Sequence, residues 1–231
     1  CSNCTDVSHL PLEECAKRVI DVLSLKGIEG LDEVHATAEH TISLMLQALR
    51  HQCDRTSGKI GRELNGKLVC IVGWGRIGMQ VQILVLSFGA YPTGYGHYRR
   101  PADLQLSEAD IISIHASLNE TSKGMVNAEF LSKMKPGAIL VNTARHAIID
   151  LRAVIKWLER DEESIYAHDF LDDWWPNGCP NVPGVNPVHE RIIATPHIGG
   201  WTIESLHKTE ELLAEKVIEW AKQRMETTCS K

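Results

Sequence analysis

Several features are absent from this sequence of 231 residues, and each absence narrows the classes of protein to consider. No run approaches the roughly 18 consecutive apolar residues of a membrane-spanning helix, which argues against a membrane protein. The net charge is −6, so the overall charge does not support nucleic-acid binding. Internal repeats, low-complexity tracts and a signal-peptide pattern are also absent. We therefore expect a cytoplasmic protein with neither a membrane nor a nucleic-acid partner.

Cysteine occurs seven times, but not in a pattern that builds a metal site or a disulfide framework. Cys1 and Cys4 form the only close pair, and no second pair stands at a spacing typical of zinc sites. We interpret the cysteines as reduced thiols and expect no metal site. Because the chain begins with Cys rather than Met, we also expect it to be a fragment or a processed product.

Apolar segments of strand length alternate with segments of helix length along most of the chain. Strands are predicted over residues 19–25, 67–72, 90–95, 111–114, 138–142, 165–170 and 191–194. Helices are predicted over residues 11–18, 36–51, 101–109, 128–134, 150–160 and 204–224. This alternation predicts an α/β fold with a doubly wound parallel sheet.

The most informative segment is GWGRIG at residues 73–78, which lies between an apolar strand and an amphipathic helix that ends near residue 88. This is the G-x-G-x-x-G pattern in the strand–turn–helix context of a dinucleotide site. Gly73 allows the tight turn, Gly75 lets the backbone approach a pyrophosphate, and Gly78 lets the helix pack closely on the strand. The helix N-terminus would hold the anion through its N–H groups and its dipole. The alternative is a glycine-rich turn in another kind of α/β protein.

Three further segments place polar residues where predicted strands end, which is the edge at which open α/β sheets bind ligands. They are Asn142 to Arg145, Asp169, and TPHIGG at residues 195–200. Together with AEHT at residues 38–41 and the glycine motif, this ordered set resembles the D-isomer-specific 2-hydroxyacid dehydrogenases. That group includes D-lactate, phosphoglycerate and formate dehydrogenases and the C-terminal-binding-protein corepressors. The resemblance extends over nearly the whole chain.

The resemblance implies a role for each of these residues. Arg145 would bind the substrate carboxylate and polarise the carbonyl, and His197 would exchange a proton while the nicotinamide exchanges a hydride. Asp169 would hydrogen-bond the nicotinamide carboxamide. The alternatives are a surface arginine and a histidine that caps a turn. The implied cofactor contacts are Gly73, Gly75, Arg76, Ile77, Gly78, Thr143, Ala144, Arg145, Asp169, His197, Gly199 and Gly200.

Four positions depart from the family pattern. The glutamate expected to hydrogen-bond the histidine is replaced by Trp174, whose indole N–H only donates. His146 replaces the glycine that usually follows the arginine, and Gly96 stands where an acid should bind the ribose. Asp6 replaces a glycine whose backbone would hold the substrate carboxylate. We therefore expect weak dehydrogenase activity and a cofactor preference that is not strict for NAD, which leaves NAD or NADP.

The chain is shorter than the family pattern at two places, residues 50–61 and residues 103–108. The second gap leaves no room for an outer third strand, so the strand at 90–95 should be a sheet edge, where Pro92 is tolerated. The resemblance implies three parts: a remnant of a flavodoxin-like substrate domain at 1–35, an NAD(P)-binding Rossmann domain at 36–203, and a C-terminal helix at 204–231 that packs toward the substrate domain.

The function favoured by this reasoning is NAD(P)-dependent interconversion of a 2-hydroxy acid and a 2-oxo acid, carried out by a homodimer as is usual in the family. One alternative is a catalytically silent dinucleotide-binding sensor or a corepressor-like interaction module. The other is a truncated product without a selected function. The small-molecule substrate belongs to the 2-hydroxy or 2-oxo acids, and its identity depends on residues that belong mostly to the absent part of the substrate domain.

Overall fold

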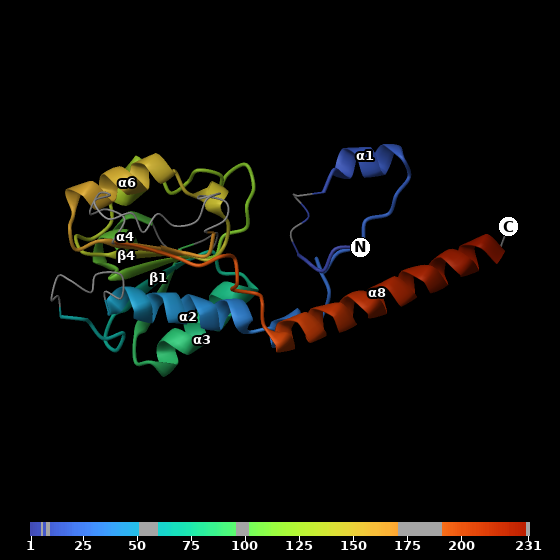
Figure 1. Ribbon diagram of the computed structural model, residues 1–231, viewed down its shortest axis with the longest axis horizontal. Coiled ribbons are helices and arrows are strands. Elements are labelled where there is room, and N and C mark those ends of the chain that lie inside the picture. Colours follow the sequence, from blue (N-terminus) through green and yellow to red (C-terminus); the bar gives the residue numbers. More distant parts are fainter. Residues whose placement is uncertain (6, 8–9, 51–59, 96–101, 171–190, 230–231) are drawn as a thin grey trace. The chain divides into compact units, whose positions relative to one another are not determined.

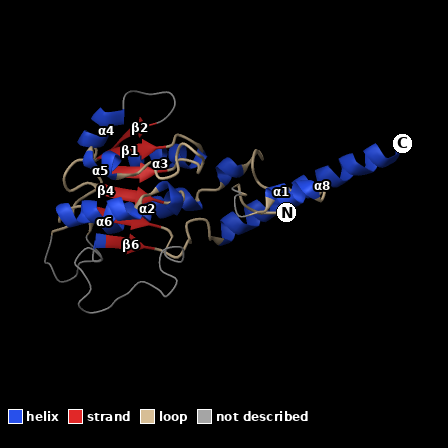
Figure 2. Cartoon of the chain, turned by 90° about the horizontal axis from the view of Figure 1, so that it is seen from above, coloured by secondary structure: helices blue, strands red, loops and turns tan. Residues whose placement is uncertain are grey.

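Six strands form one sheet in which every neighbouring pair is parallel. Their order is β2-β1-β3-β4-β5-β6, and Figure 2 shows the strands side by side. The predicted Rossmann-type α/β fold is therefore confirmed. The strand bounds are β1 Leu68–Val72, β2 Tyr91–Tyr95, β3 Ile111–Ile114, β4 Ile139–Asn142, β5 Ile165–His168 and β6 Ile192–Ala194.

The computed structural model describes the chain apart from residues 6, 8–9, 51–59, 96–101, 171–190 and 230–231 (Figure 1). The described residues form two compact units. One unit is Ala36–Gly199 and contains the sheet, whereas the other combines Cys1–His35 with Gly200–Lys231. Three residues of the sequence predictions, Asp6, Gly96 and Trp174, lie outside the described residues.

Helices cover both faces of the sheet, with α2 and α3 on one face and α4, α5 and α6 on the other (Figure 1). Alternation along the strands supplies both cores: Val69 and Ile71 pack with α2 and α3, while Cys70 and Val72 face the opposite helices. Burial on both faces explains why β1, β3, β4 and β5 are almost continuously apolar. The helix bounds are α2 Ala36–Leu49, α3 Arg76–Ser87, α4 Ala102–Glu108, α5 Ala128–Ser132 and α6 Leu151–Arg160.

β2 forms one edge of the sheet, as the short connection after it predicted. Among the described residues its only neighbour is β1, and Pro92 lies opposite Val69 in that pairing. Proline lacks the N–H that a second neighbour would need, so an edge tolerates it and a central position does not. The connection from β2 to β3 contains the helix α4.

The predicted strand at 19–25 is wrong. In this segment only Ser24 makes a β-bridge, with Ser2, and Val19 adopts a φ of 55° that a strand does not accommodate. The apolar pattern is typical of a buried strand, but a strand also needs a pairing partner, and the segment pairs with none of the six strands of the described sheet. The remaining elements form as predicted with small shifts at their ends, and the last helix extends to Cys229.

The other unit is built on the long helix α8 (Ile203–Cys229), with α1 (Leu12–Lys17) and the short 3₁₀ helix η1 (Leu31–Glu33). Leu25, Leu31 and Leu212 form its small core. Lys208 pairs with Glu33 at 2.7 Å, and Lys216 Nζ donates to the Ser24 carbonyl at 2.8 Å. Helix α8 therefore packs along the segment before α2.

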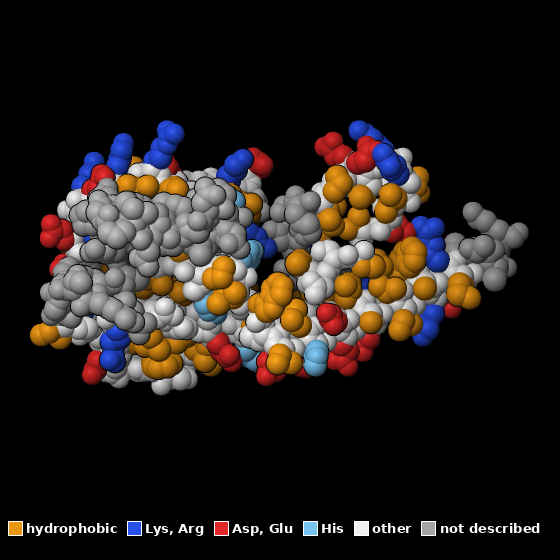
Figure 3. Space-filling view, viewed as in Figure 1, with side chains coloured by type: hydrophobic (Ala, Val, Ile, Leu, Met, Phe, Trp, Pro, Cys, Tyr) orange, Lys and Arg blue, Asp and Glu red, His pale blue; other side chains and the backbone are white. Residues whose placement is uncertain are grey.

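Hydrophobic side chains also lie on the surface of this unit over α8 (Figure 3). Ile203 and Met225 are 71% and 69% exposed. Among the described residues of this unit, only four apolar side chains are buried, namely Leu25, Leu31, Val34 and Leu212. This unit therefore contributes less hydrophobic stabilisation than the sheet-containing unit. No described helix combines the length and the apolar character needed to cross a membrane.

Candidate functional site

The glycine motif forms the turn between β1 and α3. Gly73 has a φ of 101°, and a Cβ there would lie 2.4 Å from the backbone nitrogen of Ala116. A Cβ at Gly78 would lie 2.2 Å from the Gly73 carbonyl oxygen. Both contacts are with backbone, which cannot swing aside as a side chain can. These two glycines are therefore required by the turn and by the close packing of α3 on β1, as predicted.

Gly75 is different, because neither its conformation nor its neighbours require glycine. Its φ is −88°, and a Cβ built there would meet nothing within 4 Å. It is the N-cap of α3, makes no side-chain cap bond, and is followed by no acidic residue in the first helical turn. The position therefore presents open space in front of the amide groups of a helix N-terminus, which is an arrangement that suits an anion.

The loop after β4 is shaped by Asn142. Its side-chain amide donates to the Arg145 carbonyl at 3.0 Å, and its side-chain oxygen accepts from the Ala144 amide at 3.0 Å. Asn142 is fully buried, so these bonds hold the loop from beneath. Arg145 is half-buried, and its guanidinium donates to the Ala144 carbonyl at 2.6 Å. The loop thus places an arginine fork at the carboxyl edge of the sheet.

The loop after β6 is held by the buried carboxylate of Asp169. Its Oδ1 accepts from the Thr195 hydroxyl at 2.6 Å and from the Ile198 amide at 2.9 Å, and its Oδ2 accepts from the Gly199 amide at 2.6 Å. These bonds and the nearby His40 lower the pKa of Asp169, although burial alone would raise it. Asp169 is therefore an ionised anchor for this loop. The hydrogen bond predicted between Asp169 and the nicotinamide carboxamide would be made in addition to these bonds.

His197 and Arg145 lie on neighbouring loops that meet around Phe170. The His197 ring packs edge-on against Phe170 with centroids 5.3 Å apart, and the His146 ring lies 6.4 Å from Phe170 on the loop after β4. His197 is exposed and has a φ of 53°, a left-handed value that non-glycine residues seldom adopt. Phe170 itself is 2% exposed, so it forms the floor between the two loops.

Helix α2 reaches both loops, and its residues were not among the predicted site residues. His40 Nε2 lies 2.9 Å from the Thr195 hydroxyl, and Thr41 Oγ1 lies 2.8 Å from Thr143 Oγ1. Thr41 also donates to the Thr37 carbonyl at 2.7 Å, so it accepts from Thr143. The AEHT segment was the signal for these contacts. It indicated the family, but spacing alone could not show which loops the helix touches.

The predicted site residues fall into three groups in the structure. The glycine motif supplies Gly73, Gly75, Arg76, Ile77 and Gly78 between β1 and α3. The loop after β4 supplies the second group, Thr143, Ala144 and Arg145. The segments after β5 and β6 supply the third group, Asp169, His197 and Gly199, and all three groups lie at the carboxyl ends of strands. Gly200 is the first residue of the second unit's C-terminal part. Among the described residues, no group of three His, Cys, Asp or Glu side chains is arranged to hold a metal ion.

His168 is a buried histidine beneath this site, and we expect it to make folding stability depend on pH. Burial lowers its pKa from 6.5 to about 4, although the charge of Asp169 partly opposes this shift. The unfolded chain takes up this proton below pH 6.5, while the folded chain does not until about pH 4. Stability is therefore lost as the pH falls through this window, by about 2 kcal/mol between pH 7 and pH 5.

Urea unfolding at the two pH values measures this loss, and His168→Phe should remove the share that comes from His168. His115, whose pKa burial also lowers to about 4, contributes in the same direction and remains in that variant. The exposed His207 offers a matched control, since His207→Phe should leave the pH dependence unchanged. An equal pH dependence in wild type and His168→Phe would contradict the prediction.

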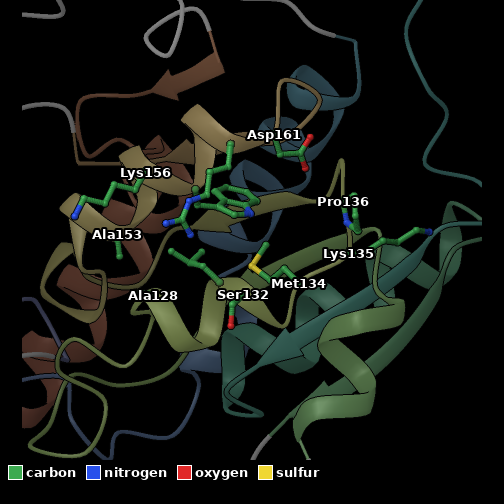
Figure 4. A pocket seen from close by; sticks show the side chains of 11 residues that line it. Ala128, Ser132, Met134, Lys135, Pro136, Ala153, Lys156 and Asp161 are labelled. Carbon is green, nitrogen blue, oxygen red and sulfur yellow. The ribbon is translucent and has the colours of Figure 1, made fainter.

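A separate groove of about 380 Å³ lies between α5 and α6 (Figure 4). Its lining includes Ala128 and Ser132 from α5, Ala153 and Lys156 from α6, and the turn at Pro136. That turn precedes β4, so the groove lies near the amino end of the strand, whereas the polar loops follow the carboxyl ends. None of the predicted site residues lines it.

Comparison with known proteins confirms the resemblance that the sequence motifs indicated. The family model of the D-isomer specific 2-hydroxyacid dehydrogenase NAD binding domain matches residues 34–199. A D-3-phosphoglycerate dehydrogenase of Mycobacterium bovis is 31% identical over 224 residues, which are 86% of this chain and 42% of that protein. A glyoxylate reductase of Thermofilum pendens is 31% identical over 246 residues, which are 94% of this chain and 70% of that protein.

Solved structures agree with this assignment. The crystal structure of D-lactate dehydrogenase from Aquifex aeolicus, in complex with NAD and lactic acid, matches with a TM-score of 0.77 and 25% identity. The match covers 97% of this chain and 76% of that one. The present chain spans less than half the length of the phosphoglycerate dehydrogenases that it matches. Since the family model covers most of the chain, the protein belongs to the D-isomer-specific 2-hydroxyacid dehydrogenases and contains their NAD-binding domain.

Proposed function

We propose that this chain binds NAD or NADP and transfers a hydride between the nicotinamide and a 2-hydroxy or 2-oxo acid. The observation that carries the proposal is the placement of three loops along one edge of the sheet. The glycine turn, the Arg145 loop and the His197 loop all follow the carboxyl ends of parallel strands. Ligands of open α/β sheets bind at that edge.

The glycine turn supports dinucleotide binding through the space in front of Gly75. A Cβ there would meet nothing within 4 Å, so packing does not require this glycine, and the approach of a ligand would account for it. A pyrophosphate at this position would accept from the amides that open α3, next to Arg76 and Ile77. The bound nicotinamide would supply or accept the hydride. Thr143 and Ala144 in the loop after β4, and Gly199 in the loop after β6, would border it.

Arg145 and His197 support chemistry on a small acid. A guanidinium carries five donors in a planar fork, which matches the two oxygens of a carboxylate. Asn142 holds the backbone of Arg145 through its carbonyl. The guanidinium of Arg145 would bind the substrate carboxylate and orient the 2-oxo group. An imidazole can hold a proton near neutral pH, so His197 would donate it to the carbonyl oxygen during reduction and remove it during oxidation.

The names of the similar proteins support a class of substrate but do not single out one substrate. Those compared above are named as a phosphoglycerate dehydrogenase, a glyoxylate reductase and a lactate dehydrogenase. Each of the three names refers to a small 2-hydroxy or 2-oxo acid, and we propose the same class for this chain. The residues expected to lower its activity, Trp174 and Asp6, lie outside the described part of the structure.

Titration with NADH and NADPH, followed by nicotinamide fluorescence, tests the cofactor part of this proposal. We expect saturable binding of both, with NADH less than about tenfold tighter, because Gly96 supplies no carboxylate to accept from the ribose or repel a 2′-phosphate. Turnover is then measured with glyoxylate, pyruvate and hydroxypyruvate. Dinucleotide binding without any turnover would support the alternative of a silent sensor, and failure to bind either dinucleotide would contradict the proposal.

The homodimer and the cytoplasmic location stay predictions. Sedimentation of the purified chain measures its oligomeric state and so tests the predicted homodimer. The three-part domain division also stays a proposal, in which residues 1–35 are what this chain holds of the substrate domain.

A further inference from the structure

His197 has a backbone conformation that its surroundings must hold in place. A φ of 53° is a left-handed conformation that is unfavourable for a residue with a Cβ. Its own amide donates to the Thr195 carbonyl at 3.0 Å, and the next two amides, of Ile198 and Gly199, donate to the Asp169 carboxylate. The bonds that offset this cost are therefore concentrated on Asp169 and Thr195.

The turn also packs tightly where it meets these groups. A Cβ at Gly199 would lie 2.8 Å from Asp169 Oδ2 and 3.3 Å from His40 Cδ2. Asp169 is 2% exposed, and the side chain of His40 is 14% exposed. The turn thus packs directly on both side chains.

The hydrogen-bond directions in this cluster follow from its chemistry. An ionised carboxylate only accepts, so the Thr195 hydroxyl donates its single proton to Asp169 Oδ1 at 2.6 Å. The same hydroxyl oxygen must then accept from His40 Nε2 at 2.9 Å. His40 Nε2 therefore carries a hydrogen, which is an assignment by chemical reasoning, and it lies 3.5 Å from the carboxylate as well.

We propose that His40 is a positioning residue, which acts through the Thr195 hydroxyl and the Asp169 carboxylate to hold the turn that carries His197. This inference rests on the proposed function, in which His197 moves the proton. Neighbouring Thr41 holds Thr143 on the arginine loop, so two consecutive residues of α2 support the two loops that act on the substrate. Helix α2 thereby sets where the proton donor stands relative to the carboxylate-binding arginine.

Two pairs of variants test this role in the full chain. His40→Phe and Thr195→Val each remove a hydrogen-bonding group while keeping most of the volume, whereas His40→Gln and Thr195→Ser keep a donor or a hydroxyl. We expect His40→Phe and Thr195→Val to lose at least about tenfold in kcat, with the KM for glyoxylate and the Kd for NADH changed less than about threefold. Thr195→Ser should retain most of kcat, and His40→Gln part of it.

Amide hydrogen exchange provides a second readout that does not depend on turnover. We expect the Ile198 and Gly199 amides to exchange at least about tenfold faster in His40→Phe and Thr195→Val than in wild type. The exposed His35 gives a matched control, because His35→Phe should change neither exchange nor kcat.

The outcomes separate the inference from the proposed function. Wild-type values of kcat and of exchange at both amides in His40→Phe would overturn the positioning role. A lowered melting temperature with an unchanged kcat would overturn it as well, since that is what a merely structural residue produces. If the wild-type chain neither binds NADH nor turns over, the proposed function fails, and the exchange rates still decide whether His40 holds the turn.

Discussion

Alanine at Gly78 or Gly73 is expected to destabilise the sheet-containing unit by about 3 kcal/mol, because the new Cβ overlaps backbone atoms in a packed core. At Gly78 it would stand 2.2 Å from the Gly73 carbonyl oxygen, and at Gly73 it would stand 2.4 Å from the Ala116 nitrogen. The φ of 101° at Gly73 adds strain that only glycine avoids. Urea unfolding, followed by far-ultraviolet circular dichroism, measures both losses.

Gly75→Ala is the matched control, because the same substitution meets nothing within 4 Å there. Its stability should stay within about 1 kcal/mol of wild type, while its affinity for NADH should fall about tenfold or more through contact with the pyrophosphate. The three alanines therefore separate a structural glycine from a ligand-facing one. Equal stability of Gly78→Ala and Gly75→Ala would show that α3 is not packed on β1 as described.

Loss of His197 or Arg145 is expected to have the largest effect on any turnover that the chain shows. His197→Asn keeps hydrogen-bonding capacity but cannot hold a proton near neutral pH, so kcat should fall by about 10²–10⁴-fold. Arg145→Leu removes a charge-assisted contact with the substrate carboxylate, which is worth about 1.5–3 kcal/mol. We therefore expect kcat/KM for the 2-oxo acid to fall about 10–150-fold in that variant.

Steady-state kinetics with glyoxylate and NADH measure both effects, and NADH binding should stay close to that of wild type. Arg152 lies exposed at the start of α6 and gives a control of equal charge, since Arg152→Leu should leave kcat/KM unchanged. A kcat of His197→Asn near the wild-type value would remove His197 from the proton-transfer role. In that case the acid/base group would have to be sought outside the loop after β6.

Two separate experiments concern His197. One tests the low activity expected from the sequence, and the other tests the positioning role of His40. Trp174→Glu tests whether a missing acceptor limits His197, because a carboxylate can orient and charge an imidazole whereas an indole cannot. His40→Phe tests whether the turn that carries the ring is held. A gain in kcat in the first variant and a loss in the second would indicate that ring orientation and backbone position are controlled separately.

The sequence alone determined the fold class and pointed to candidate site residues, because both depend on local patterns. The alternation of strand and helix segments predicted the parallel sheet, and a short connection with Pro92 predicted that β2 is an edge. Turn geometry requires glycine at Gly73 whatever the rest of the chain does, since its φ is positive. Such constraints act within a few residues and can be recognised without coordinates.

Only the tertiary structure decided which groups support the site. His40 meets Thr195 across 155 residues of sequence, and Thr41 meets Thr143 across 102, so no local pattern relates them. The sequence predicts a contact between Asp169 and a cofactor, and only the structure shows that its oxygens also accept from a loop that begins 26 residues later. The segment at 19–25 has the pattern of a strand and forms none, because strand formation depends on neighbours as well as composition. These long-range contacts depend on the order of the strands in the sheet, because that order decides which strand ends are close to one another. The strand order is a property of the whole fold.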